Sequence, residues 1–302
     1  SPGPMHITKP YGERGLLPCR TKIGKGPETQ MTESDVHDSP RRSDHGDDVL
    51  VERRGAVLLV TLNRPERLNA INEGLSRGLG DAIHLANTDR DINAMVIAAS
   101  GRAFCAGMDL DAFVDDEPIV HPEHPEWGVA GIVQHSVAVP VIAAVHGVAA
   151  GGGFEIALCA DLIVAEETAR FALPEIKLGL FAAAGGLIRL PQSMPPRIAN
   201  ELALTGRFAE AEELAHWGVV NMVTPAGKAR EEALKLAGRI ADNAPIATRA
   251  TKELVSKAFS STSNAPGWAA NARLMNDVFV TSDAREGVAA FQEKRLPRWS
   301  GQ

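Results

Sequence analysis

The chain has 302 residues, which is long enough for one large domain or two smaller ones. It is 44% hydrophobic and carries a net charge of −7, so its composition suits a globular protein with a full core and argues against general nucleic-acid binding. The three cysteines, Cys19, Cys105 and Cys159, are odd in number and too widely spaced for a disulfide framework or a zinc site. We therefore expect a reducing compartment, the cytoplasm.

Residues 1–47 differ from the rest of the chain. They are rich in Gly and Pro and poor in apolar residues, and no helical or strand period runs through them. Such a segment cannot bury enough apolar surface to offset its ordering entropy, so we predict a flexible N-terminal extension. The acidic residues Glu13 and Glu28 argue against a transit peptide, and Met31 is a candidate initiator.

Regular patterning begins at residue 48. The first expected elements are a β-hairpin of Val49–Arg53 and Ala56–Leu62 that turns at Gly55, a helix from Ile71 to about Asn87, and short strands at Ala94–Ala99 and Val141–Val145. Because each of the two short strands follows a helix-like stretch, we predict repeated βα units and a largely buried parallel sheet.

Residues 127–154 contain no charged side chain, which is long enough to suggest a transmembrane helix. Six glycines and Pro140 interrupt the stretch, so we interpret it as a buried strand followed by a glycine-rich loop and expect no membrane contact. Helices are expected later in the chain at 196–204, 209–217, 227–243, 245–259, 264–279 and 282–294. We therefore divide the chain after the extension into a sheet-rich core, 48–225, and a helical C-terminal region, 226–302.

Two glycine-bearing loops each follow an expected strand directly. One runs from Gly101 to Asp109, and the other from His146 to Glu155. A loop of this kind can present bare backbone N–H groups at the start of a helix, where an anion or a developing oxyanion is stabilised. The alternative is that the glycines only permit close packing of strand and helix.

Familiar catalytic motifs are absent from the sequence. Neither loop fits the dinucleotide-binding pattern, and there is no phosphate-binding P-loop, nucleophile elbow or zinc-protease motif. His121 and His124 are separated by Pro122 and followed by Pro125, so no helix brings them together and we interpret them as loop residues. We predict no metal site.

Two glutamates are the candidate acid–base residues. Glu155 follows the second glycine loop, and Glu175 follows a strand-like stretch that ends at Pro174. Two carboxylates that face one cleft with different pKa values can act as general acid and general base. The alternatives are that Glu155 caps its own helix and that Glu175 lies in a surface turn.

Residues 48–302 resemble the crotonase (enoyl-CoA hydratase/isomerase) superfamily. The motifs that carry the resemblance occur in crotonase order: Leu62–Pro65 with Leu68–Ala70, Phe104–Asp109, Gly151–Glu155, Pro174-Glu175, Gly185-Gly186 and the closing Phe291–Arg295. Glu155 and Glu175 also have the separation typical of the hydratases. The resemblance implies an α/β fold, the ClpP/crotonase-like spiral of ββα units with a C-terminal helical region, assembled as a homotrimer or a dimer of trimers.

The resemblance also implies roles for individual residues. The backbone N–H groups of Met108 and Gly152 would form the oxyanion hole, Glu155 would be the base that activates water, and Glu175 would deliver a proton to the α-carbon. The acyl and pantetheine path would be lined by Met108, Asp109, Leu110 and Asp111. Phe291 and Lys294 would contact the adenine end of CoA, often from a neighbouring subunit. No metal or redox cofactor is implied, and CoA is part of the substrate.

The resemblance favours a lyase that hydrates a 2-enoyl-CoA or dehydrates a 3-hydroxyacyl-CoA. The run Ala182–Gly186 departs from the commonest hydratase pattern, and several stretches more closely resemble the carnitinyl-CoA dehydratase branch. That dehydratase is therefore the first alternative, followed by a double-bond isomerase, which typically retains only one such carboxylate. An RNA-binding relative is disfavoured, because residues 71–93 contain no lysine. The two retained glutamates also argue against a catalytically silent scaffold.

Overall fold

Strands β1 (Val49–Arg54) and β2 (Val57–Leu62) form the antiparallel hairpin expected from the sequence. Gly55 makes the turn between them with a φ of +59°, a value that favours glycine. The computed structural model describes residues 48–114, 117–259, 273, 277 and 280–302. The expected extension, 1–47, and the helix expected at 264–279 therefore lie outside or almost outside the described residues.

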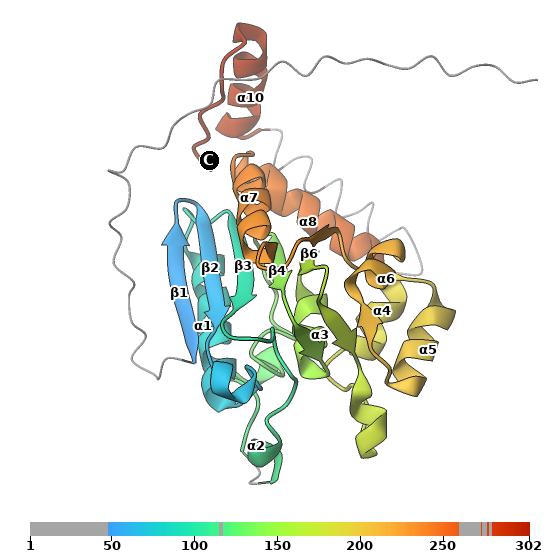
Figure 1. The fold of residues 1–302 in the computed structure, drawn as a ribbon. Coiled ribbons are helices and arrows are strands. Elements are labelled where there is room, and N and C mark those ends of the chain that lie inside the picture. The colour runs from blue at the N-terminus through green and yellow to red at the C-terminus, as the bar shows by residue number, and fades with distance from the viewer. Residues whose placement is uncertain (1–47, 115–116, 260–272, 274–276, 278–279) are drawn as a thin grey trace, which may run out of the picture. The chain divides into compact units, whose positions relative to one another are not determined.

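A six-stranded sheet forms the centre of the fold (Figure 1). Its remaining strands are β3 (Ala94–Ala99), β4 (Val141–Val145), β6 (Leu162–Glu166) and β9 (Met222–Thr224), and the order is β1-β2-β3-β4-β6-β9. All pairs after the hairpin are parallel. Side chains of β2 alternate between two apolar clusters, with Leu58 and Val60 in one and Val57 and Leu59 in the other. The sheet is buried on both faces, as predicted.

Helices cover the two faces of this sheet. Helix α1 (Glu73–Thr88) packs against β1 and β2, and α7 (Ala229–Ala241) packs on the other face against β2, β3, β4 and β6. The Asn72 side chain caps α1 by accepting a 2.9 Å hydrogen bond from the Leu75 N–H. The helix begins two residues later than predicted, because Ile71 forms a β-bridge with Met108.

A second, three-stranded sheet consists of β5 (Val148–Ala150), β7 (Arg170–Ala172) and β8 (Ala209–Glu210). The prediction of a helix over 209–217 was wrong at its start. Ala209 pairs with Phe171 of β7, so only Ala211–His216 is helical (α6). Helix α3 (Gly152–Cys159) follows β5 directly, which places a helix N-terminus at the end of a buried strand.

The remaining elements are mostly short helices. They are η2 (Pro65–Arg67), α2 (Leu110–Val114), η3 (Pro125–Trp127), η4 (Pro174–Leu178), α4 (Gly186–Ser193), α5 (Pro196–Thr205), α8 (Pro245–Phe259) and α10 (Ser282–Glu293). The described residues all belong to one unit, Ser39–Gln302, so the boundary expected at residue 225 stays a prediction. No described helix combines the length and the apolar character needed to cross a membrane.

Candidate active site

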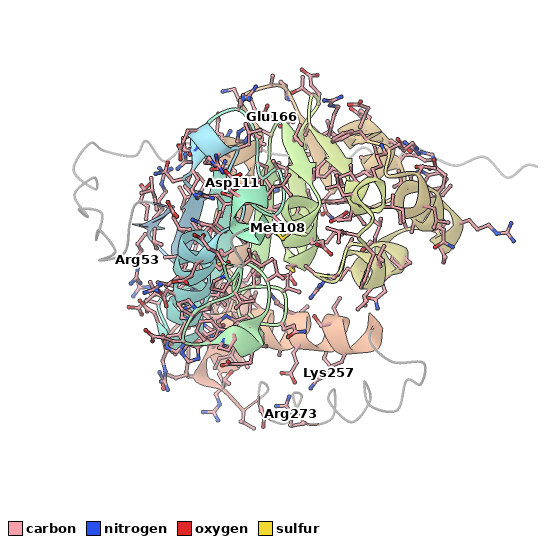
Figure 2. The ribbon with its side chains drawn as sticks, turned by 90° about the horizontal axis from the view of Figure 1, so that it is seen from below. Arg53, Met108, Asp111, Glu166, Lys257 and Arg273 are labelled. Carbon is pink, nitrogen blue, oxygen red and sulfur yellow. The ribbon has the colours of Figure 1, made fainter. Side chains whose placement is uncertain are left out.

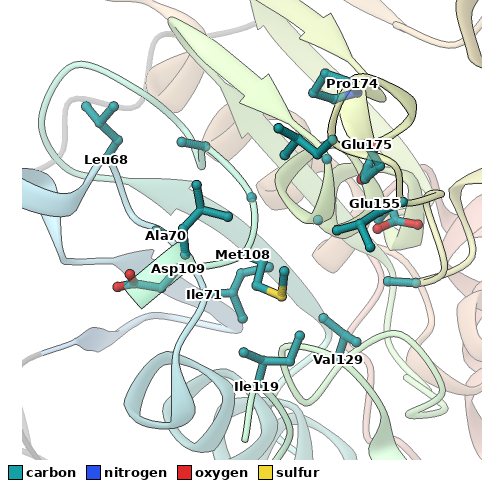
Figure 3. Close-up of a pocket in the computed structure, with 18 of the residues that line it drawn as sticks. Leu68, Ala70, Ile71, Met108, Asp109, Ile119, Val129, Glu155, Pro174 and Glu175 are labelled. Carbon is teal, nitrogen blue, oxygen red and sulfur yellow. The ribbon is translucent and has the colours of Figure 1, made fainter. Parts of the chain in front are cut away.

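A pocket of about 700 Å³ opens where the two glycine-bearing loops meet (Figure 3). The loop after β3 supplies Gly107 and Met108, and the loop after β5 supplies Gly151 and Gly152. Both predicted glutamates also line this pocket. Segments separated by up to about 70 positions in the chain therefore meet around one cavity, because their strands are neighbours in the parallel sheet or in the smaller sheet beside it.

Two backbone N–H groups, those of Met108 and Gly152, lie close together where the loops meet. In the β-bridge between Ile71 and Met108, the Ile71 N–H donates to the Gly107 carbonyl and the Asp109 N–H donates to the Ile71 carbonyl. The Met108 N–H takes no part in these bonds. A Cβ atom placed on Gly152, the first residue of α3, would lie 3.9 Å from the Met108 nitrogen. Within the described chain, neither N–H donates a hydrogen bond. Such a pair of unengaged donors can bind an oxyanion.

The glycines allow this close approach. Gly107 has a φ of +105°, and a Cβ there would lie 3.0 Å from the Ala150 carbonyl oxygen. A Cβ on Gly153 would lie only 2.1 Å from the Cys105 carbonyl oxygen. Close packing and exposed N–H groups are thus two consequences of the same residues, so the two interpretations of the glycine loops are compatible.

Glu155 is a buried carboxylic acid on α3, and only 2% of its surface is exposed. Its Oε1 accepts a 2.8 Å hydrogen bond from the backbone N–H of Gly186, the first residue of α4. The carboxylate therefore does not cap its own helix, and that alternative is wrong. Burial raises the pKa of Glu155 to about 7, and the neighbouring Glu175 carboxylate adds to the rise.

Glu175 lies on η4 and is half-buried rather than in an exposed turn. Figure 3 shows it beside Glu155 on one side of the pocket. Its Oε2 is buried and accepts no hydrogen bond from the described residues. Burial raises the pKa of Glu175 as well. Two buried acids that lie close together and have raised pKa values suit acid–base chemistry.

An ion-pair network supports the Met108 loop. Asp109 is buried and accepts hydrogen bonds from Arg64 at 3.0 Å and from Arg67 at 2.9 Å, and Arg67 also pairs with Asp111. Burial acts to raise the pKa of Asp109, but the hydrogen bonds from Arg67 and Arg64 hold that pKa below its usual value. Arg64 also donates to the Ala70 carbonyl, so the network ties the loop to the segment before α1.

Some of the other predicted site residues line the pocket, and one described residue, Lys294, does not. Asp109, Leu110 and Asp111 line the pocket, and Leu110 and Asp111 are exposed. Figure 2 shows Met108 and Asp111 near the middle of that view, far from Arg53 at its edge. Lys294 is exposed directly after α10 and does not line the pocket. The Phe291 side chain lies outside the described parts, so the CoA contact expected from a neighbouring subunit stays a prediction.

Histidines surround Trp127 beside the pocket. The rings of His124 and His135 stack on the indole with centroid distances of 4.1 and 3.9 Å. Two rings cannot share one face at those spacings, so they enclose the indole from both sides. His121 is buried, packs edge-on against Trp127 and hydrogen-bonds Asp81 at 3.1 Å. This histidine–tryptophan cluster holds the segment that brings Ile119 and Val129 to the pocket wall.

Several residues at the site were not predicted from the sequence. Arg64 and Gly186 belong to motifs that the sequence displays, but their contacts with Asp109 and Glu155 join segments far apart in the chain. Arg67 carried no signal of its own. Arg189 lies in Arg189-Leu190-Pro191, one of the stretches that resemble the carnitinyl-CoA dehydratase branch, but that resemblance gave it no role. In the described residues, no group of three or more His, Cys, Asp or Glu side chains is placed to hold a metal ion.

Two unengaged N–H donors beside two buried carboxylates are an arrangement that can stabilise a developing oxyanion while protons move. The fold that carries it is the expected crotonase-like α/β fold. The chain belongs to the enoyl-CoA hydratase/isomerase family, whose model matches residues 52–302. It is thus a crotonase-family enzyme of the hydratase and dehydratase kind, in a family that acts on CoA thioesters.

Individual relatives carry two kinds of name. Carnitinyl-CoA dehydratases of Proteus mirabilis and Salmonella typhi are each 40% identical to this chain over 258 residues, which cover 82% of this chain and 96% and 97% of theirs. The crystal structure of an enoyl-CoA hydratase from Mycobacterium tuberculosis aligns with a TM-score of 0.81 and 42% identity, over 84% of this chain and 99% of that one. A carnitinyl-CoA hydratase from Mycobacterium avium aligns with a TM-score of 0.68 and 43% identity, over the same shares of the two chains.

Proposed function

We propose that the protein adds water across the double bond of a 2-enoyl-CoA thioester, or catalyses the reverse dehydration of a 3-hydroxyacyl-CoA. The observation that carries this proposal is the position of two carboxylates, both with raised pKa, beside two unengaged backbone N–H groups in one pocket. An isomerase needs one carboxylate to shuttle a proton, whereas hydration needs one group to take a proton and another to give one.

The proposed reaction begins with the thioester oxygen between the N–H groups of Met108 and Gly152. Ionised Glu155 takes a proton from water as the water oxygen bonds to C3, and the electron pair of the double bond moves toward the thioester to form an enolate. Protonated Glu175 then gives its proton to C2. Each N–H donor contributes roughly 3–4 kcal/mol of transition-state stabilisation in comparable sites. The thioester accepts the electron pair, so the step needs no metal or redox cofactor.

The lining of the pocket supports an apolar acyl group. Figure 3 shows Ile71, Ile119 and Val129 grouped around Met108, below the two glutamates in that view. These side chains offer apolar surface and no charge. A hydrocarbon acyl chain would gain from its burial there, about 25 cal/mol per Å² of apolar surface.

A second candidate is a carnitinyl-CoA dehydratase. The 40% identity with proteins of that name favours it, and it would use the same two glutamates for the same kind of proton transfer. The two candidates differ in the acyl group, because the carnitinyl chain ends in a quaternary ammonium group that an apolar wall stabilises poorly.

A panel of thioesters distinguishes the candidates. The protein is incubated with 2-enoyl-CoA thioesters of several lengths and with crotonobetainyl-CoA, and the loss of the enoyl absorbance is followed. We expect turnover of the unsubstituted enoyl thioesters at a higher kcat/KM than crotonobetainyl-CoA. Preference for crotonobetainyl-CoA would establish the second candidate instead, and no hydration of any thioester would refute the proposed function.

A further inference from the structure

We infer that Arg189 is a positioning residue for Glu155, which holds the segment that presents the Gly186 N–H and supplies the positive charge that favours the ionised carboxylate. This inference rests on the proposed function, in which Glu155 takes the proton from water. Arg189 is half-buried on the first turn of α4 and does not line the pocket. It would therefore act through Glu155 and not on the substrate.

The guanidinium of Arg189 lies directly against the start of α4. A Cβ placed on Gly185 would lie 2.0 Å from its Nη1, so the arginine occupies the space that any side chain at Gly185 would need. Gly185 also has a φ of +93°, which favours glycine. The next residue is Gly186, whose N–H binds Glu155. Arg189 thus packs against the residue that directly precedes this donor and supports the donor's position.

Arg189 also joins two walls of the pocket. Its Nη2 donates a 2.6 Å hydrogen bond to the carbonyl of Val133, in the segment that brings Val129 to the pocket. Its Nη1 lies 3.5 Å from the carbonyl of Ala184, which lines the pocket from the other side. These bonds fix the guanidinium in place, since both acceptors belong to the backbone.

The charge of Arg189 is not neutralised locally. Among the residues that the structure describes, no carboxylate lies within ion-pair distance of its guanidinium, and its hydrogen bonds go to neutral carbonyls. The ionisable groups that act on Glu155 are Glu175 from η4, Arg189 from α4 and Cys159 from its own helix. Burial raises the pKa of Cys159 to about 11, so the thiol is neutral at neutral pH.

The charges around Glu155 therefore oppose each other. Glu175 disfavours its ionised form, while Arg189, the weakest of the influences on this carboxyl, favours it. Burial remains the largest influence and raises the pKa of Glu155 to about 7. Without Arg189, Glu155 would hold its proton to a higher pH, and less of the enzyme would carry an ionised base.

A direct titration of Glu155 tests this inference without turnover. The protein is labelled with ¹³C at glutamate side-chain carboxyls, and the Glu155 signal is assigned by its loss in Glu155→Gln. We expect Arg189→Gln to raise the titration midpoint of Glu155, on the order of a few tenths of a pH unit. Arg189→Lys keeps a positive charge and should lie closer to the wild type. Arg197→Gln, which removes an exposed arginine of the neighbouring helix α5, is the matched control and should change nothing.

The pH profile of kcat/KM provides the second measurement, and its acidic limb should move with the midpoint in Arg189→Gln. If Arg189→Gln does not fold, Arg189→Met repeats the test with an uncharged stem of similar length. An unchanged Glu155 midpoint in a folded variant without the charge would overturn the inference, as would equal shifts in the Lys and Gln variants. A wild-type protein that hydrates no thioester would refute the proposed function while leaving the titration result interpretable.

Discussion

The Gly186 N–H donates a 2.8 Å hydrogen bond to Oε1 of Glu155, 31 positions earlier in the chain. A backbone donor at the start of a helix cannot rotate away as a side chain can, so the bond fixes the orientation of a buried carboxylate. The bond also links the start of α4 to α3. By contrast, the buried Oε2 of Glu175 lacks a partner in the described residues.

The two glutamates should act as a unit in catalysis. Glu155→Gln and Glu175→Gln keep the shape of the side chain and remove its proton-transfer role, so each should lower kcat by at least about 10²-fold. The double variant should be only slightly slower than the slower single variant, since groups that act together are not additive. Steady-state kinetics with the best enoyl thioester measure all three values.

Affinity for free CoA is the control for these variants, because neither glutamate is expected to contact the nucleotide. If Glu155→Gln hydrates at nearly the wild-type rate while Glu175→Gln is inactive, a single carboxylate suffices. The hydration mechanism is then wrong, and the isomerase alternative is favoured.

Glu155 should also make stability depend on pH. Its pKa is raised from the usual 4.5 to about 7, so the folded state binds this proton more tightly than the unfolded state. The resulting stabilisation is complete below about pH 4.5 and is lost as the pH rises through 7, a change of up to roughly 3 kcal/mol. The variant Glu155→Gln has no carboxyl proton to lose, so its stability does not fall in this way. The free energy of unfolding of the variant minus that of the wild type should therefore be larger at pH 8 than at pH 5. Urea denaturation at both pH values measures the difference, and a constant difference would contradict the raised pKa.

In the ion-pair network around Asp109, the buried pair with Arg64 should contribute more to stability than the exposed pair with Arg67. The Arg64 side chain is 12% exposed and that of Arg67 is 43% exposed, although both bind Asp109. Asp109→Asn removes the closer counter-charge of the buried Arg64, which keeps only Asp48 at 3.6 Å, and should cost roughly 3 kcal/mol. Arg67→Ala should cost clearly less, because water screens the ion pairs of this exposed arginine. Chemical denaturation gives both values. Equal costs for the two variants would show that burial does not govern this network.

The histidine–tryptophan cluster should be sensitive to acid. Burial lowers the pKa of His135 below its usual 6.5, and His84, His121 and His124 lower it further. A lowered histidine pKa means that the stabilisation is present above pH 6.5 and is lost as the pH falls through the folded-state value. His135→Asn should therefore reduce the fall in melting temperature between pH 7 and pH 5. His216→Asn, at an exposed histidine outside the cluster, should leave that fall unchanged.

Local pattern was sufficient for most of the fold. The hairpin at Gly55, the buried strands β3 and β4, and helices such as α8 follow from apolar periodicity and turn residues that lie within a few positions of each other. The errors occur where a distant partner decides the conformation. Ile71 bonds to the Met108 loop in place of extending α1, and Ala209 pairs with β7 in place of starting a helix.

In the site, too, local motifs were predictable and contacts between distant segments were not. The glycine loops and the glutamates are visible in the sequence because each motif is local. The donor from Gly186 to Glu155 and the packing of Arg189 on Gly185 depend on how α3 and α4 meet, which no short pattern records. The pKa of Glu155 depends mainly on burial, so it too requires the folded structure.

The two carboxylates are carried by elements that are buried to different degrees. Glu155 lies on α3, surrounded by buried side chains such as Phe154 and Ile156, whereas Glu175 lies on the short helix η4, whose next residues include the exposed Ile176 and Leu178. Segments with few buried contacts open at lower free energy than core helices. We therefore expect acyl groups of different width or branching to displace the Glu175 side of the pocket and to leave Glu155 in place. In that case η4, and not the helix that holds Glu155, would determine the breadth of substrates.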